Sequence, residues 1–147
     1  MSLLDFATER YGRPGVKEAM LALQDAHGQS VPLLFWALWT RCEDDQIIGM
    51  AVRLAREWEA DIIGPLRGVR RKLKPRVFLQ DTGTRQDLYA LAKEVELGAE
   101  GVLLDTLDAL VPQRPCASAI EAMARTCRAW GDPPPQETLA KLAGLLG

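Results

Sequence analysis

A chain of 147 residues has the length of one domain, and 48% hydrophobic with 26% charged residues is the composition of an ordinary globular protein. β-Branched residues are scarce while Ala and Leu are abundant, which predicts an all-α, single-domain bundle of about six to seven helices. The net charge of −2 excludes a surface devoted entirely to phosphate backbones, although it allows a local basic patch.

Cysteines and the chain start indicate the compartment. Cys42, Cys116 and Cys127 are odd in number and have no Cys-x-x-Cys spacing, so they predict reduced thiols rather than a zinc site or a redox motif. Residues 1–5 lack the basic and apolar parts of a signal peptide. The apolar stretch at residues 31–39 is much shorter than the ~20 residues of a membrane span. We therefore expect a cytoplasmic protein that does not engage a membrane.

Two helices are predicted at the start of the chain. Ser2 and Asp5 can cap the first, which ends at Gly12 because a residue without Cβ can turn the chain there. Pro14 suits the first turn of the second helix, since the N–H that it lacks would be unpaired in that position. This second helix is expected to run to Gly28.

A very apolar third helix is expected around residues 31–42, capped by Ser30. Because it is apolar on every side, it should occupy the centre of the bundle. The acids at residues 43–45 favour the start of a fourth helix, whose apolar positions recur as far as Ile62. Pro65 is expected to kink or split that helix.

The longest predicted helix covers residues 85–111, opened by Thr84 and ended by Pro112. Its apolar residues lie on two nearly opposite faces, one with Leu88, Leu91, Val95, Ala99, Val102 and Leu110, the other with Leu97 and Leu104. We therefore expect this helix to contact partners on two sides.

The sequence divides into a helical bundle domain over residues 1–132 and a C-terminal segment over residues 133–147. Three consecutive prolines open this segment as a stiff spacer. A short final helix follows, with Leu139, Leu142, Leu145 and Leu146. It either belongs to the same domain or forms a tail that docks on its own chain or on a copy of it.

Several short motifs stand out from the rest of the chain: Arg13-Pro14-Gly15-Val16, Leu23-Gln24-Asp25-Ala26-His27-Gly28, Leu33-Leu34-Phe35, Pro65-Leu66-Arg67 with Arg70-Arg71, and Glu96-Leu97 with Ala99-Glu100. They resemble the signature of domain-of-unknown-function family 2390, a bacterial family of small intracellular proteins. The likeness covers residues 3–74 and returns around residues 94–110. It implies an all-helical cytosolic protein and supplies no reaction.

His27 is the only histidine, and with Asp25 and Arg13 it could line a pocket and serve as a general base. A histidine in the last turn of a helix also interacts well with the free carbonyls there, and we favour that interpretation. No further ligand stands at metal-binding spacing, and no nucleophile motif or phosphate loop is present. The sequence therefore predicts no catalytic residue, no metal and no cofactor.

Residues 67–76 form a basic amphipathic segment with six of the chain's eighteen basic residues and no acid. The candidate binding residues are Arg67, Arg70, Arg71 and Lys74, which share one side of a helix, together with Arg76. One interpretation is a site for a phosphorylated ligand, nucleic acid or an acidic partner protein. The other is internal pairing with Glu96 and Glu100, which lie one turn apart on the long helix.

The leading functional hypothesis is a non-enzymatic helical interaction module, an adaptor or regulator, because catalytic motifs are absent while charged surfaces and an amphipathic tail are present. We expect its partner to be a protein, with a second copy of the chain as one candidate. The alternative is binding of an anionic ligand or nucleic acid through residues 67–76. A third hypothesis is an enzyme with a pocket around Asp25 and His27.

Overall fold

The computed structural model describes residues 1–74, 80–111 and 118–146. Within these residues the fold is all-helical and contains no strand, as predicted. The elements are α1 (Leu3–Tyr11), α2 (Val16–His27), α3 (Val31–Thr40), α4 (Asp45–Trp58), the π-helical turn η1 (Glu59–Ile63), α5 (Gly64–Lys72), α6 (Gly83–Asp108), α7 (Ala119–Trp130) and α8 (Gln136–Leu146). Because α4, η1 and α5 continue without a break, they form one bent rod, and the described parts of the chain thus contain seven helical rods.

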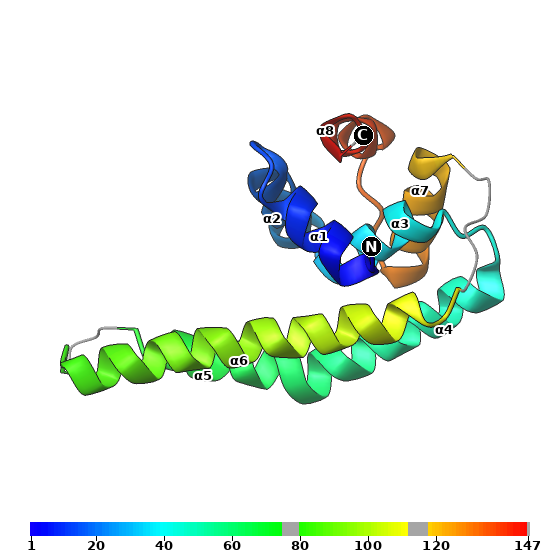
Figure 1. The fold of residues 1–147 in the computed structure, drawn as a ribbon. Coiled ribbons are helices and arrows are strands. Elements are labelled where there is room, and N and C mark those ends of the chain that lie inside the picture. Colours follow the sequence, from blue (N-terminus) through cyan, green and yellow to red (C-terminus); the bar gives the residue numbers. More distant parts are fainter. Residues whose placement is uncertain (75–79, 112–117, 147) are drawn as a thin grey trace.

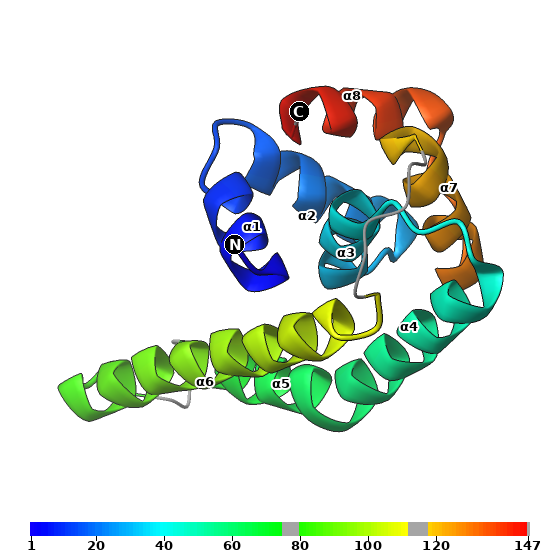
Figure 2. The same ribbon diagram turned by 45° about the vertical axis from the view of Figure 1, so that its right-hand side comes forward.

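The molecule consists of a body and a projecting pair of helices (Figure 1, Figure 2). The body contains α1, α2, α3, α7 and α8. The rod of α4, η1 and α5 lies beside α6 and antiparallel to it, and both run beneath the body. Their far end extends beyond the body. We call η1 and α5, together with residues 83–102 of α6 beside them, the arm.

The apolar helix α3 lies in the centre of the body, as its sequence predicts. All its side chains from Leu33 to Leu38 are buried, and it contacts α1, α2, α4, α6 and α7. Trp36 is fully buried, and its indole Nε1 donates a hydrogen bond of 3.0 Å to the carbonyl oxygen of Leu107. This hydrogen bond attaches the body to α6, and it satisfies an indole N–H that has no water to bind.

Capping side chains explain several helix starts. Ser2 and Asp5 form the predicted capping box at α1, and Ser30 caps α3. Asp44, within the acidic run before α4, accepts hydrogen bonds from two backbone N–H groups of the first turn. Such bonds satisfy donors that have no partner inside the helix.

Several helix boundaries differ from the prediction, and among them the long helix ends at Asp108 rather than at residue 111. Pro14 lies in the turn before α2 because Gly15 adopts a left-handed conformation, with φ of 82°. The third helix ends two residues early, because Arg41 is left-handed with φ of 48°. The long helix begins at Gly83, since Thr82 rather than Thr84 is its cap and accepts from a backbone N–H.

Pro65 interrupts the long rod through a π-helical turn. In η1 the N–H of Gly64 donates to the carbonyl oxygen of Glu59, five residues earlier. A proline cannot donate the next bond and its ring needs room near the preceding turn, so a wider turn relieves the strain. A Cβ on Gly64 would lie 2.7 Å from the Glu59 oxygen, so this turn requires glycine.

The burial of α6 differs from the predicted pattern. Four residues of the first predicted face, Leu88, Leu91, Val95 and Val102, are 47–54% exposed, and Leu97 of the other face is 65% exposed. The buried residues are Glu96, Ala99, Leu103, Leu104 and Leu107. The cause is that the N-terminal half of α6 extends past the body, while Val102, in the half that reaches α1 and α3, lies on the side of α6 turned away from them. The expectation of partners on two sides therefore fails for the arm.

The final helix α8 docks on its own chain. Leu139, Leu142 and Leu146 are buried in the same core as α2 and α7, and Leu145 is 42% exposed. The sequence allowed this helix to pack on its own chain or on a second copy. In the structure it packs on its own chain and so forms part of the body.

Candidate functional site

The predicted basic helix and the predicted acids meet along one side of the arm. The carboxylate of Glu96 accepts hydrogen bonds from Nε of Arg67 at 3.2 Å and from Nε of Arg70 at 2.5 Å. Arg67 also donates to Glu59 at 2.9 Å and approaches Glu100 at 3.9 Å. We call these five residues the ion cluster. It is the internal pairing that the charge pattern suggested.

Glu96 is the one charged side chain that is buried within the described residues, with 8% exposure. A carboxylate in such a place is stable only when it is paired and hydrogen-bonded. Each of its oxygens accepts from a different arginine of α5, so the contact sets the register of α5 against α6. The hydrogen bond to Glu96 is also the main cause that raises the pKa of Arg70.

Glu100 differs from Glu96, although the sequence treats the two alike. A third of its side chain is exposed, and among the described residues its one ion-pair contact is the distant one with Arg67. Burial raises the pKa of the Glu100 carboxyl, and the carboxylates of Glu96 and Glu59 raise it further, against the opposing effect of the arginines. The Glu100 carboxyl therefore loses its proton less readily than an ordinary glutamate does, whereas Glu96 serves as the pairing carboxylate.

Glu59 is the member of the ion cluster that the sequence analysis missed. At about 100° per residue, an unbroken helix would place Glu59 and Arg67 roughly 80° apart. The extra residue of η1 reduces this angle to about 20° and brings both side chains to one side of the rod. The sequence signal for this shift was Pro65, which stands six residues after Glu59 and interrupts the regular helix between Glu59 and Arg67.

The remaining cations of the basic segment have different surroundings. Arg71 and Lys74 are exposed, and no ion pair is found for either within the described residues. Arg76 lies outside those residues. Because Arg67 and Arg70 already bind carboxylates of their own chain, an external anion would meet fewer cations than the sequence suggests.

Apolar side chains form a stripe along α6. Leu88, Leu91, Val95 and Val102 are spaced by three, four and seven residues, and at about 100° per residue they fall within a sector of roughly 60°. Each is about half exposed. Four half-exposed apolar side chains on one helix face are unusual on the surface of a monomer.

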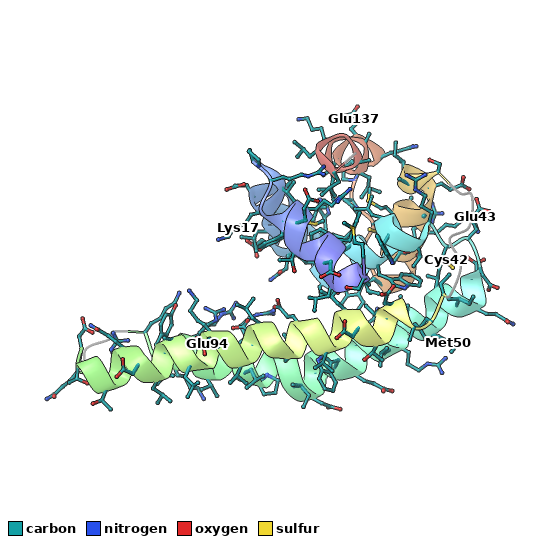
Figure 3. All side chains as sticks on the ribbon, in the orientation of Figure 1. Lys17, Cys42, Glu43, Met50, Glu94 and Glu137 are labelled. Atoms are coloured by element: carbon teal, nitrogen blue, oxygen red, sulfur yellow. The ribbon has the colours of Figure 1, made fainter. Side chains whose placement is uncertain are left out.

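The stripe faces away from the body. On the body side of α6, Gly101 lies next to Leu4, and Asp108 accepts from the backbone N–H of Leu3 at 3.0 Å. The residues of the stripe lie at least about 80° around the helix from both of these positions. In Figure 3, α6 crosses in front of α5, and the labelled Glu94 lies on α6.

Val69 of α5 extends the apolar surface onto the second helix. It is 50% exposed and lies roughly 160° around α5 from Arg67, so it points away from the ion cluster. We call the stripe together with Val69 the arm face. The arm thus carries its paired charges on one side and open apolar side chains on the other.

The three residues of the suggested pocket lie on the body. Asp25 is exposed, and His27 is half-buried in the last turn of α2, where a cationic group interacts well with free carbonyls. Arg13 donates to Glu9 at 2.9 Å and to the carbonyl oxygen of Leu146 at 3.3 Å. The structure gives these three side chains no shared contact in the described residues.

An open cavity of roughly 420 Å³ lies where the body meets the C-terminal end of α6, and none of the predicted site residues lines it. Asp108 lines this cavity, but its carboxylate already accepts from Trp39 Nε1 at 2.9 Å and from the N–H of Leu3.

No group of three metal-ligating side chains occurs in the described parts of the chain. Cys42 and Cys127 are buried free thiols, and burial raises the pKa of Cys127 to about 12.

The fold and these surfaces define a small all-helical protein with a projecting two-helix arm. The chain belongs to the family of proteins of unknown function DUF2390, which it matches over residues 2–107. The match covers α1 to α5 and nearly all of α6, and it confirms the resemblance seen in the sequence. No curated protein and no solved structure matches the chain. Among the described residues, no helix combines the length and the apolar character that crossing a membrane requires.

Proposed function

We propose that this chain is a non-catalytic protein-interaction module of the cytoplasm, an adaptor or regulator, and that the arm face is its binding surface. The observation that carries the proposal is the row of half-exposed Leu88, Leu91, Val95 and Val102 on a helix that extends beyond the body. Single exposed apolar residues are normal, whereas a continuous row on one helix face is typical of a surface that another helix covers.

The construction of the arm supports this proposal. The ion cluster joins α5 to α6 on one side, and Trp58 Nε1 donates to the carbonyl oxygen of Ala99 at 2.7 Å nearer the body. These contacts hold the helices together without the stripe. The apolar side chains of the arm face therefore remain available to a partner.

Binding of an anionic ligand or nucleic acid is the second candidate, favoured by the exposed Arg71 and Lys74. A phosphate backbone is bound through several accessible cations at once. Two of the arginines proposed for that purpose, Arg67 and Arg70, are engaged with Glu96. We therefore rank this candidate below protein binding.

The proposal is tested by placing a photo-crosslinking amino acid at Leu91 in the intact chain inside cells. Leu145, a comparably exposed leucine on the body, is the matched control position. Irradiation should join the Leu91 variant to a protein and give no such adduct for the Leu145 variant. The absence of adducts at Leu91, or the same adducts from both positions, would contradict the proposal.

A further inference from the structure

We propose that the occupant of the arm face is a second copy of the same chain, so that two arms pack together as a four-helix bundle. This inference rests on the proposed function and names the partner. Three properties of the arm support it: the spacing of its apolar residues, the distribution of its charges and the area that it offers.

The spacing of the stripe is that of a coiled-coil seam. Leu88, Leu91, Val95 and Val102 occupy alternating three-residue and four-residue steps when Gly98 is counted between the last two. This repeat matches helices that pack side by side at a shallow crossing angle, and small residues such as Gly98 allow close approach. The natural occupant is therefore a helical rod that runs nearly parallel or antiparallel to α6, as the rod that ends in α5 can do.

The charges of the arm indicate whether α6 packs against α5 or against α6 of the second copy. In α5 every charged residue is basic: Arg67, Arg70, Arg71 and Lys72. In α6 acids predominate, with Asp87, Glu94, Glu96, Glu100, Asp105 and Asp108 against Arg85 and Lys93. Packing α6 of one copy over α5 of the other therefore brings opposite charges together, whereas α6 over α6 would bring acids together.

This pairing is self-complementary. Because α5 and α6 are antiparallel within one arm, a twofold axis along the arm places α6 of each copy against α5 of the other, again antiparallel. Each helix of the resulting bundle then has antiparallel neighbours on both sides, and the apolar stripe of each α6 meets the other stripe and Val69 of both copies in its centre.

The area is sufficient for a specific but modest dimer. Residues 83–102 of α6 give a face about 30 Å long, and two helices are about 20 Å wide, so each copy offers on the order of 600 Å². A total of roughly 1,200 Å² lies at the lower end of specific interfaces, which predicts a monomer–dimer equilibrium in roughly the micromolar range.

Sedimentation equilibrium of the purified full chain tests the inference. The parent protein should dimerise, and Leu91→Glu should weaken the dimer by at least about tenfold, because it places a charge in the apolar seam. Leu97→Glu is the matched control, since Leu97 is exposed on a different side of α6 and should leave the equilibrium unchanged. Circular dichroism of each variant establishes that its helices remain.

A second variant tests which helices meet. Replacing Asp87 and Glu94 by lysine should weaken the dimer, also by about tenfold, because the new cations would face the basic α5 of the other copy. If α6 packed on α6 instead, lysines would replace acids on both copies and the like-charge repulsion would persist with little change. An unchanged equilibrium for this double variant would overturn the proposed pairing.

The outcomes also separate this inference from the proposed function. A parent protein that stays monomeric up to about 1 mM, far above the predicted range, would overturn self-association. If the Leu91 crosslinker then captured a different protein, the interaction module would stand and only its partner would be wrong. If Leu91 captured nothing, both proposals would fail. A Leu91→Glu variant that dimerises like the parent would overturn the assignment of the dimer to the arm face.

Discussion

Nε of Arg70 donates a hydrogen bond of 2.5 Å to the carboxylate of Glu96, and this contact joins the two helices of the arm. Arg67 binds the other oxygen of the same carboxylate. Both contacts lie on the side of the arm that is remote from the apolar stripe. The arm therefore uses charge pairing for its own stability and keeps its apolar side chains for another purpose.

The first prediction concerns this contact. Glu96→Gln should lower the free energy of unfolding by about 1–3 kcal/mol, because it leaves two neighbouring guanidinium groups without their carboxylate. Glu94→Gln, which changes an exposed acid of the same helix, should have an effect below about 0.5 kcal/mol. Urea denaturation followed by circular dichroism measures both. Superimposed curves for Glu96→Gln and the parent would exclude a stabilising role for the pair.

The second prediction concerns pH. Burial, followed by the neighbouring Glu96, raises the pKa of Glu100 above its ordinary value of 4.5. A carboxyl group with a raised pKa binds its proton more tightly in the folded state, so its contribution to stability is full below the unfolded pKa and is lost as pH rises through the folded pKa. From about pH 4 to about pH 7 the parent should thus lose stability relative to Glu100→Gln, by less than about 1 kcal/mol because solvent screens the group. Urea midpoints at several pH values measure the difference, and an opposite slope would refute the assignment.

The third prediction concerns the π-helical turn. Gly64→Ala should cost about 1–3 kcal/mol of stability, since its Cβ would lie 2.7 Å from the Glu59 carbonyl oxygen. Gly68→Ala, in the same helix with open space around the position, should instead stabilise by about 0.5–1 kcal/mol. Thermal melts of the two variants should therefore shift in opposite directions. An unchanged or higher melting temperature for Gly64→Ala would show that η1 does not constrain Gly64.

The fourth prediction concerns the C-terminal helix. Leu142→Ala should destabilise the protein by about 2–4 kcal/mol, because Leu142 is buried among α2, α7 and α8. Leu145→Ala, at a largely exposed position of the same helix, should cost less than about 1 kcal/mol. Chemical denaturation gives both values. Equal small effects would mean that α8 does not pack on the body in solution.

Local features of this fold were predictable from the sequence. The side chains of Ser2 and Ser30 accept hydrogen bonds from backbone N–H groups three residues later, so each cap can be predicted from a segment of four residues. The central place of α3 was also predictable, because a helix that is apolar on every side has no face for water. The pairing of Arg67 with Glu96 followed from the charge pattern once antiparallel packing was assumed.

Features that depend on distant contacts were not predictable. Leu91 and Leu104 both look like core positions, and only the extent of the body beneath α6 decides that Leu104 is buried and Leu91 is exposed. Glu59 reaches Arg67 because η1 changes the angle between the two residues around the rod. The regular period of an α-helix does not predict this change. The unequal environments of Glu96 and Glu100 arise from the same three-dimensional packing.

The central claim is that a second copy covers the arm face, and amide hydrogen exchange at several protein concentrations measures this most directly. Raising the concentration through the micromolar range should slow exchange in residues 83–102 of α6 and in α5, and should leave the buried helices of the body unchanged. The same experiment on Leu91→Glu should show no concentration dependence. Exchange in the arm of the parent protein that is identical at every concentration would contradict the account.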